Sequence, residues 1–370
     1  MSTDETTWSR LASLNVAIDG ARLEPRASRT SSGWVRRTTR IELFDARERR
    51  GAGEDVTYDG AVHLARAPLA LPEAGARDAG AFRFRGTLAE FSRAIDPLVD
   101  EVEGDYLRFG LEAAALDLAL VQADAHLGDV VGRNPRPVRF AVSMGLGPLA
   151  QVEALDEVLE RAPDTRFKID FSEAFTDRTV ERLAASGRVD VLDLKAHYHG
   201  DFQGPAPDAR LYGELASALP NAWLEDPTLD GACGEALAPH LERVTWDAPL
   251  KSLADLTGLA TRPRCINVKP SRFGSIETLC AVLDHCAQNG IACYGGGQFE
   301  LDVGRRQIQE IAALWYPDAP NDVAPGLYNA RPLPADPPRS PLVVGPGWGF
   351  GAGDSDRGAS VRGASDGASR

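Results

Sequence analysis

The sequence predicts an α/β protein, with a barrel of alternating strands and helices preceded by a smaller α+β region. From residue 138 onward, short apolar runs alternate with amphipathic stretches, which is typical of parallel strands joined by crossover helices. About eight such units fit into roughly 190 residues, close to the size of an eight-stranded barrel domain. An open, doubly wound sheet is the alternative that this pattern leaves.

The region before the barrel predicts antiparallel strands followed by helices. Residues 38–44 are β-branched and alternate in polarity, as strands do, whereas the polar residues 26–33 predict a loop. Residues 87–102 predict a helix that opens with a capping box. Residues 106–128 carry apolar side chains at helical spacing and predict a second, buried helix.

A run of Gly, Asn and Pro at residues 132–137 marks the expected boundary between two domains. The last residues are rich in Gly, Ala and Ser, which predicts disorder. We therefore expect four regions: an α+β domain over residues 1–134, the barrel over 135–330, a segment packing back on the first domain over 331–348, and a disordered tail over 349–370.

Composition excludes several classes of partner. The formal net charge of −14 argues against binding to nucleic acid or to an anionic membrane surface. There is no apolar run long enough to cross a membrane, and the polar, acidic N-terminus lacks the layout of a signal peptide. The five cysteines form no CxxC pair and are expected to be reduced thiols of a cytoplasmic protein. The oligomeric state stays open, with a homo-oligomer among the alternatives.

Acidic residues close three successive strand runs of the barrel region. Asp193, Glu225 and Asp247 each stand at the end of such a run. The carboxyl ends of barrel strands meet at one rim, and three hard oxygen ligands suit Mg²⁺, with Mn²⁺ as an alternative. Lys168 and Lys269, on the strands to either side, would flank this metal.

Metal and flanking amines suit one type of reaction. A proton α to a carboxylate is a very weak acid, and a metal stabilises the enediolate that forms when it leaves. A nearby cation also keeps a lysine neutral enough to act as a base. We expect Lys269 to be this base and Lys168 to bind the carboxylate of a small organic acid.

The order of these motifs resembles the enolase superfamily, in particular its muconate-lactonizing and o-succinylbenzoate-synthase-like branch. The resemblance rests on Lys168-x-Asp170, Asp193, Trp-Leu-Glu225-Asp-Pro, Asp247 and Val-Lys269-Pro-Ser-Arg-Phe-Gly. It implies a (β/α)7β TIM-like barrel with an α+β N-terminal capping domain, a Mg²⁺ site at Asp193, Glu225 and Asp247, and the base Lys269.

The activity that the resemblance implies is dehydration or isomerisation by a lyase or isomerase of the dehydratase, synthase or cycloisomerase type. A relative that binds a carboxylate or a partner protein without turnover is the alternative from another class.

One departure from that branch concerns its second strand. The branch carries Lys-x-Lys there, whereas this chain has Asp170 at the second lysine position. Lys195 lies two residues after Asp193, and residues two apart in a strand share a face. We predict an ion pair between Asp170 and Lys195, in which Lys195 supplies the amine that the second strand lacks. The alternative is that Lys195 only neutralises Asp170.

Further residues near the strand ends are candidates for binding the substrate. Asn267 shares the face of Lys269, Ser271 and Arg272 could hold an anion, and the glycine run at residues 295–297 could form an anion nest. The candidate set is Asn267, Ser271, Arg272, Gly297, Gln298 and Glu300.

Two other kinds of site are weighed against these. The glycine run leaves a metal-free phosphate-binding barrel enzyme as a third alternative. His197, His199 and Asp201 could bind a transition metal, although a solvated loop is the better interpretation of their spacing.

Overall fold

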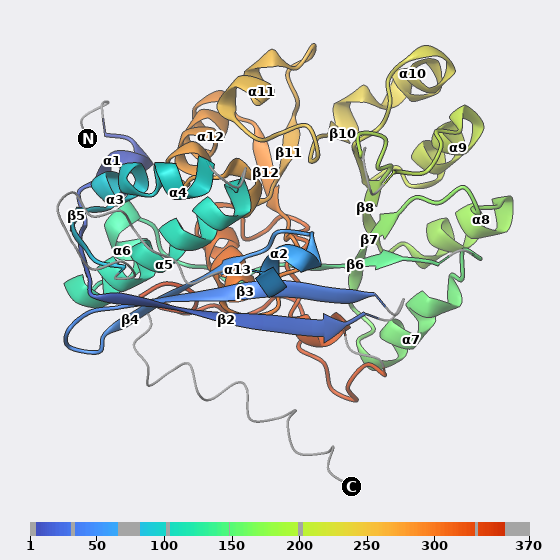
Figure 1. Ribbon diagram of the computed structural model, residues 1–370. Coiled ribbons are helices and arrows are strands. Elements are labelled where there is room, and N and C mark those ends of the chain that lie inside the picture. The colour runs from blue at the N-terminus through green and yellow to red at the C-terminus, as the bar shows by residue number, and fades with distance from the viewer. Residues whose placement is uncertain are drawn as a thin grey trace, which may run out of the picture.

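The computed structural model describes residues 5–30, 34–65, 82–100, 104–147, 149–198, 203–329 and 332–351. Within these residues, an N-terminal α+β domain lies against one side of a parallel α/β barrel (Figure 1).

An antiparallel meander in the order β2-β3-β4 forms the base of the N-terminal domain. Arg26 pairs with Thr38 in the register of β2 and β3, and its guanidinium forms an ion pair with Asp302 at 2.7 Å. The loop predicted for residues 26–33 is therefore wrong in its first part, because pairing with β3 extends the strand to Arg29. The strands are β1 (Asn15–Ile18), β2 (Gly20–Arg29), β3 (Val35–Phe44), β4 (Arg50–Asp55) and β5 (Phe84–Thr87), with β1 paired to β5.

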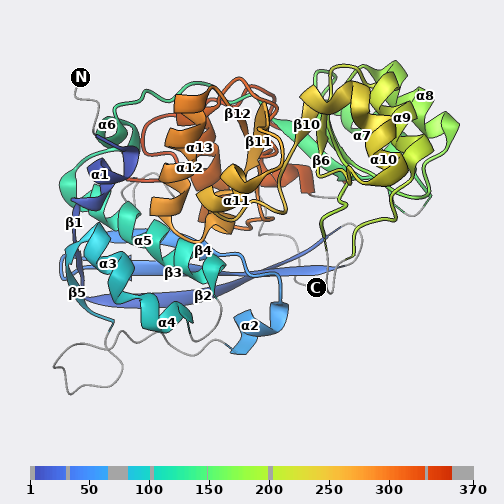
Figure 2. The ribbon, with the colours of Figure 1, turned by 90° about the horizontal axis from the view of Figure 1, so that it is seen from above.

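Helix α5 (Asp105–Ala123) packs closely on β4 and lies between the meander and the barrel helix α12 (Ile276–Asn289; Figure 2). A Cβ atom at Gly51 or Gly53 would lie within 2.2 Å of the backbone of α5, so only glycine permits this approach. The helix predicted over residues 106–128 thus exists but ends at Ala123, because Asp124 adopts the left-handed conformation at φ 51°.

The remaining helices of this domain are short. Thr87 and Glu90 form the predicted capping box at the start of α3, but that helix ends at Ala94 instead of residue 102. The short helices of this domain are α1 (Thr7–Ala12), α2 (Gly60–Ala65), α3 (Leu88–Ala94), α4 (Asp96–Asp100) and α6 (Leu127–Val131).

The barrel alternates strands and helices as the sequence predicts. Its strands are β6 (Ala141–Gly145), β7 (Arg166–Asp170), β8 (Val189–Asp193), β9 (Trp223–Glu225), β10 (Val244–Thr245), β11 (Cys265–Val268) and β12 (Ala292–Gly295). Its helices are α7 (Glu153–Arg161), α8 (Asp177–Ser186), α9 (Ala209–Ala218), α10 (Gly231–Leu237), α11 (Leu253–Gly258), α12 (Ile276–Asn289) and α13 (Val303–Trp315). Short 3-10 turns occupy Ala238–Arg243 (η1), Pro270–Phe273 (η2) and Gly326–Asn329 (η3).

Two sheets make up the barrel wall. Strands β6 to β10 form a five-stranded parallel sheet, and β11 with β12 forms a second one. The backbone N–H of Asn267 donates to the carbonyl of Trp246 at 3.0 Å and joins the two sheets on one side. On the other side, Asn321 and Asp322 bridge Phe140 and Gly296 and take the place of an eighth strand. The predicted (β/α)7β barrel with a capping domain is confirmed.

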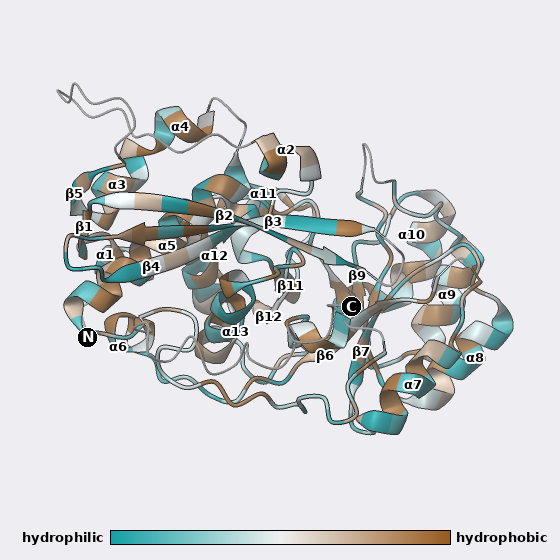
Figure 3. Cartoon of the chain, turned by 60° about the horizontal axis from the view of Figure 1, so that its bottom comes forward, coloured by the Kyte–Doolittle hydropathy of each residue, from teal (hydrophilic) through white to brown (hydrophobic). Residues whose placement is uncertain are grey.

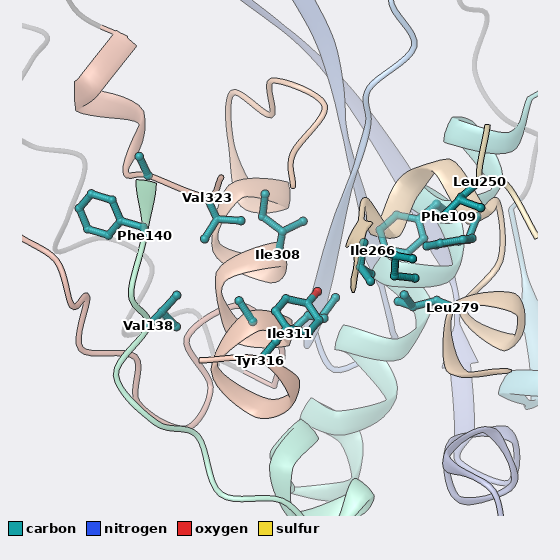
Figure 4. Close-up of a cluster of buried hydrophobic side chains, with 14 of the residues drawn as sticks. Phe109, Val138, Phe140, Leu250, Ile266, Leu279, Ile308, Ile311, Tyr316 and Val323 are labelled. Atoms are coloured by element: carbon teal, nitrogen blue, oxygen red, sulfur yellow. The ribbon is translucent and has the colours of Figure 1, made fainter. Parts of the chain in front are cut away.

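The helices divide in the same way as the sheets. In Figure 2, α7 to α10 gather on one side of the barrel, and α11 to α13 lie on the other side next to the N-terminal domain. Helices such as α7 and α8 are coloured as both hydrophilic and hydrophobic in Figure 3, because one face of each packs on the strands. Figure 4 shows part of the core, where Val138 and Phe140 lie near Val323 and the α13 residues Ile308 and Ile311.

The last described residues pack against both parts of the molecule. Leu342 pairs with Val138, and the backbone N–H groups of Gly349 and Phe350 donate to Glu310 of α13. Gly351 donates to Asp117 of α5 at 2.8 Å. Residues 349–351 are thus docked, although the sequence assigned them to the disordered tail; the rest of that tail lies outside the described residues. Within the described chain, no helix is long and apolar enough to span a membrane.

Candidate metal centre and active site

The ends of β7, β8 and β9 lie side by side in the barrel wall. Asp170, Asp193 and Glu225 are direct partners in the parallel register of these three strands. Register alone therefore brings three of the predicted site residues together at the carboxyl ends of the strands, where barrel enzymes carry their active sites.

Lys168 lies inside this acidic group. Its ammonium hydrogen-bonds Glu225 and lies 3.2 Å from Oδ2 of Asp193 and 3.8 Å from Oδ2 of Asp322. Burial would lower the pKa of Lys168, but the charges of Asp193 and Glu225 raise it well above its usual value. Lys168 thus stays charged and contacts the carboxylates directly.

A group of three buried carboxylates has the composition of a metal site. Oxygen atoms of Asp193, Glu225 and Asp226 all lie within 4.8 Å of one another. Hard oxygen donors of this kind suit Mg²⁺ or Mn²⁺, so the residues present fit a divalent cation. Asp193 and Glu225 are the predicted ligands, but the third member of this group is Asp226 and not the predicted Asp247.

The backbone explains why Asp226 points into the group. Asp226 follows β9 directly and adopts the left-handed conformation at φ 50°. Its two carboxylate oxygens accept the N–H groups of Asp247 and Ala248, each at 2.8 Å. Burial and the charges of Asp247 and Asp193 raise the pKa of Asp226 to about 7.

Asp247 is held by cations from the other half of the barrel. Its Oδ1 accepts a hydrogen bond from Arg272 at 2.5 Å, and its Oδ2 lies 2.8 Å from Nζ of Lys269. Tyr198 also donates to Oδ2 at 2.9 Å. Burial would raise the pKa of Asp247, but Arg272 and Lys269 lower it to about 2. The same carboxylate raises the pKa of Lys269 against the effect of burial.

Lys195 and Asp170 form the ion pair that the sequence predicts. Nζ of Lys195 lies 3.1 Å from Oδ1 of Asp170 and 2.8 Å from Oδ2 of Asp193. Lys195 lies beyond the end of β8 in the left-handed conformation at φ 52°, which is costly for a residue with a Cβ atom. This turn, rather than the alternation of a strand, directs the ammonium back to the carboxylates.

Asn267 reaches the same centre from β11. Its Nδ2 donates to Oε2 of Glu225 at 3.2 Å, while its buried Oδ1 has no hydrogen-bond partner among the described residues. The side chain therefore faces the site, but its donor is directed at Glu225 and its free group is an acceptor. A substrate carboxylate would need the donor.

Arg272 and Gln298 are joined to each other. With the Gln298 amide oriented to satisfy its neighbours, its oxygen accepts from Nε and Nη2 of Arg272 at 3.1 and 3.0 Å, and its nitrogen donates to Tyr58 of the N-terminal domain at 3.1 Å. The predicted anion-binding Arg272 thus directs these donors at Gln298 and Asp247. Ser271 is buried beside it in η2.

The glycine run is shaped by its own neighbours. Gly295 and Gly296 donate their N–H groups to Oδ1 of Asn321 and to the carbonyl of Val268. A Cβ atom at Gly297 would lie 2.6 Å from Oε2 of Glu300, whose Oε1 accepts the N–H of Gln298. With two N–H groups used and a carboxylate adjacent, this turn is poorly suited to bind phosphate.

Several residues at the centre were not among those predicted from the sequence. Tyr294 of β12 donates to Glu225, and Tyr198 donates to Asp247, but a tyrosine at a strand end is usually a core residue. Asp226 stood within the Glu-Asp-Pro motif and could have been proposed from it. His197 bonds the carbonyl of Pro227 at 3.0 Å, whereas His199 and Asp201 lie outside the described residues.

Solved structures of similar fold include members of the enolase superfamily. One such member from Listeria innocua is 19% identical, with a TM-score of 0.60 over 84% of this chain and 86% of that one. A dipeptide epimerase from Enterococcus faecalis is 16% identical, with a TM-score of 0.65 over 90% and 99%. A dipeptide epimerase from Methylococcus capsulatus, complexed with Mg and the dipeptide L-Arg-D-Lys, is 18% identical, with a TM-score of 0.63 over 90% and 99%. At these identities the likeness establishes the fold.

Sequence comparison places the chain more narrowly. No curated protein matches it. Two family profiles match consecutive parts, the N-terminal domain of a domain of unknown function (DUF8230) over residues 9–130 and its C-terminal domain over residues 134–330. The second match alone covers more than half of the chain, so this protein, with its barrel and its buried carboxylate centre, belongs to the DUF8230 family.

Proposed function

We propose that this protein is a divalent-cation-dependent enzyme that removes a proton α to the carboxylate of a small organic acid, through an enediolate, and then completes a dehydration or an isomerisation. The observation that carries the proposal is the buried group of Asp193, Glu225 and Asp226, whose oxygens lie within 4.8 Å of one another. Lys168 contacts Asp193 of this group, and Lys269 of the other half of the barrel is paired with Asp247.

The lysines have different roles in this proposal. A bound Mg²⁺ or Mn²⁺ would supply the positive charge that stabilises the enediolate and lowers the pKa of a neighbouring lysine. Lys269 accepts the α-proton, and Lys168 binds the substrate carboxylate. Asp247, at 2.8 Å from Nζ of Lys269, orients the base. Because this carboxylate also raises the pKa of Lys269, the base would need the positive charge of the bound cation to lose its proton. The Mg-containing dipeptide epimerase of similar fold supports both the cation and a small carboxylate substrate.

Lys195 supplies the amine that the second strand lacks. It contacts Asp170 at 3.1 Å and Asp193 at 2.8 Å, at the ends of β7 and β8. We expect Lys195→Ala to abolish turnover while Mg²⁺ affinity stays nearly unchanged, and full activity would refute the role. Lys195→Arg keeps the charge, so an active Lys195→Arg variant would show that Lys195 only neutralises Asp170.

The N-terminal domain contributes the surface for the distal part of the substrate. Trp34 and Tyr58 are stacked with ring centres 6.2 Å apart, and they are 43% and 48% exposed. Tyr58 also contacts Gln298, which connects this aromatic pair with Arg272 of the barrel. The proposal therefore favours an acid whose distal part is apolar.

Solvent-deuterium exchange tests the reaction directly. The protein is incubated in D2O with a panel of carboxylic acids, with Mg²⁺ or with EDTA, and deuterium at the α-carbon is measured by mass spectrometry. We expect exchange that needs the cation and is lost in Lys269→Met. Exchange that persists in EDTA would contradict the proposed role of the cation.

A second candidate is a protein that binds a carboxylate or a partner without turnover. It is favoured by the ammonium groups of Lys168 and Lys195, which both contact Asp193 directly and balance the charge of this carboxylate. Mg²⁺ binding, detected as a rise in melting temperature that EDTA reverses, combined with no exchange over the panel, would support this candidate instead.

A further inference from the structure

Side chains from three strands hydrogen-bond to Glu225. Tyr294 of β12 is fully buried and donates its hydroxyl to Oε2 of Glu225. Asn267 of β11 donates Nδ2 to the same oxygen at 3.2 Å. Lys168 of β7 hydrogen-bonds the other oxygen, Oε1. These donors reach the carboxylate across the barrel interior from β11 and β12 on one side and from β7 on the other.

After these hydrogen bonds, the two oxygens of Glu225 differ in the number of further bonds that they can accept. Each carboxylate oxygen offers about two lone-pair directions. Tyr294 and Asn267 use both directions of Oε2, whereas Lys168 uses one of Oε1. The carboxylate therefore presents one open direction, on Oε1, the oxygen that also faces Lys168.

We propose that Tyr294 is a positioning residue that restricts Glu225 to a single coordinating oxygen and thereby makes the site select Mg²⁺ over Ca²⁺. Mg²⁺ takes six ligands in a strict arrangement, whereas Ca²⁺ takes six to eight and readily accepts both oxygens of one carboxylate. A carboxylate with Oε2 closed by two donors suits the smaller ion. This inference rests on the cation site of the proposed function.

The surroundings of Tyr294 make the restriction firm. Tyr294 has no exposed surface. Because the buried ring packs with Val191 and Cys265, its hydroxyl oxygen cannot move away from Oε2 of Glu225 without moving β12.

The test compares Tyr294→Phe with Tyr316→Phe. Tyr316 is also buried, and its hydroxyl has no hydrogen-bond partner among the described residues, so its loss is a matched control. Dissociation constants for Mg²⁺ and for Ca²⁺ are measured separately by titration calorimetry on the EDTA-stripped full chain, without substrate. We expect the ratio of Ca²⁺ to Mg²⁺ affinity to rise about tenfold in Tyr294→Phe and to stay unchanged in Tyr316→Phe, since partners of metal ligands commonly change affinity by 10–100-fold.

Three outcomes separate the inference from the proposed function. An unchanged ratio in Tyr294→Phe, or an equal loss of affinity for both ions, overturns the positioning role while leaving the cation site intact. No binding of either ion by the wild type overturns the cation site itself. Should Tyr294→Phe fail to fold by circular dichroism, Asn267→Ala removes the other donor to Oε2, and the same rise of the ratio is expected from it.

Discussion

The two halves of the barrel hold their site residues in different ways. In the half formed by β6 to β10, a continuous parallel register places Asp170, Asp193 and Glu225 next to one another. The half formed by β11 and β12 meets it through the backbone bond from Asn267 to Trp246 and through side chains of the site. The carboxylates are thus fixed by the sheet, whereas the amines and amide opposite them are fixed by the carboxylates.

The second half is also the part to which the N-terminal domain is attached. Arg36 of β3 donates to the carbonyls of Gln298 and Phe299 at 2.9 and 3.2 Å. Glu54 of β4 accepts the N–H groups at the start of α13, including that of Gly304 at 2.9 Å. The N-terminal domain, β12 and α13 therefore form one packed unit that meets the first half at the buried carboxylate centre.

The two halves meet at the buried ion pairs of Asp247 with Lys269 and Arg272, which we call the seam. The largest effect is expected from a substitution of Asp247. Asp247→Asn removes the charge that balances Lys269 and Arg272, both of which stay buried. Leaving buried cations uncompensated should lower the free energy of unfolding by about 3–5 kcal/mol, measured by urea denaturation. Asp177→Asn is the control, because Asp177 pairs with Arg210 on the surface and its loss should matter far less. Equal effects of the two substitutions would show that charge does not hold the seam.

The attachment of the N-terminal domain predicts a pH effect of intermediate size. Burial raises the pKa of Glu54 from 4.5 to about 7 in spite of its hydrogen bonds. Because the pKa of Glu54 is higher in the folded than in the unfolded state, folding favours the protonated side chain. The contribution of this protonation to the free energy of unfolding is complete below about pH 4.5 and is lost as the pH rises through about 7.

Glu54→Gln removes the titration of this side chain. Its amide oxygen can still accept the N–H groups of Asp302 and Gly304, whereas the N–H of Leu301 loses its acceptor, which lowers stability by an amount that does not change with pH. Relative to wild type, the variant should gain up to about 3 kcal/mol of unfolding free energy between pH 4.5 and pH 8, by the conversion of 1.36 kcal/mol per pKa unit. Chemical denaturation at several pH values measures the difference. A difference that is constant with pH would mean that Glu54 does not titrate in this range.

The sequence predicted the residues that end the strands better than those that lie beyond the strands, for a physical reason. Asp193 and Glu225 close apolar strand runs, and parallel strands bring their ends together whatever the loops do. The position of Asp226 beside Asp193 and Glu225 depends on a left-handed backbone at φ 50°, and the position of Lys195 depends on another at φ 52°. Such conformations at residues other than glycine leave no trace in the sequence pattern.

Features that depend on distant partners were likewise harder to predict than those that rest on a local sequence pattern. Tyr294 looks like an ordinary core tyrosine until β12 is placed opposite Glu225. The alternation of strands and helices, the capping box of Thr87 and the buried α5 were all readable, since each rests on local periodicity or capping. The extension of β2 to Arg29 was not, because it depends on pairing with β3 and on Asp302 from a distant loop.

The smallest effect tests whether the two halves unfold together. Ser275 caps α12 in the second half by accepting the N–H of Thr278, and Thr176 caps α8 in the first half by accepting that of Thr179. Replacing either residue by Ala should lower the free energy of unfolding by about 1 kcal/mol.

The seam joins the two halves through buried charges. Separating these charges costs more free energy than either cap contributes, so opening one half alone is unfavourable. Native-state hydrogen exchange should therefore show that each substitution lowers the protection of the slowest amides in both halves by the same amount. Lowered protection confined to the substituted half would mean that the site residues bridge two units that open independently, and that the charges at the seam are too weak to couple them.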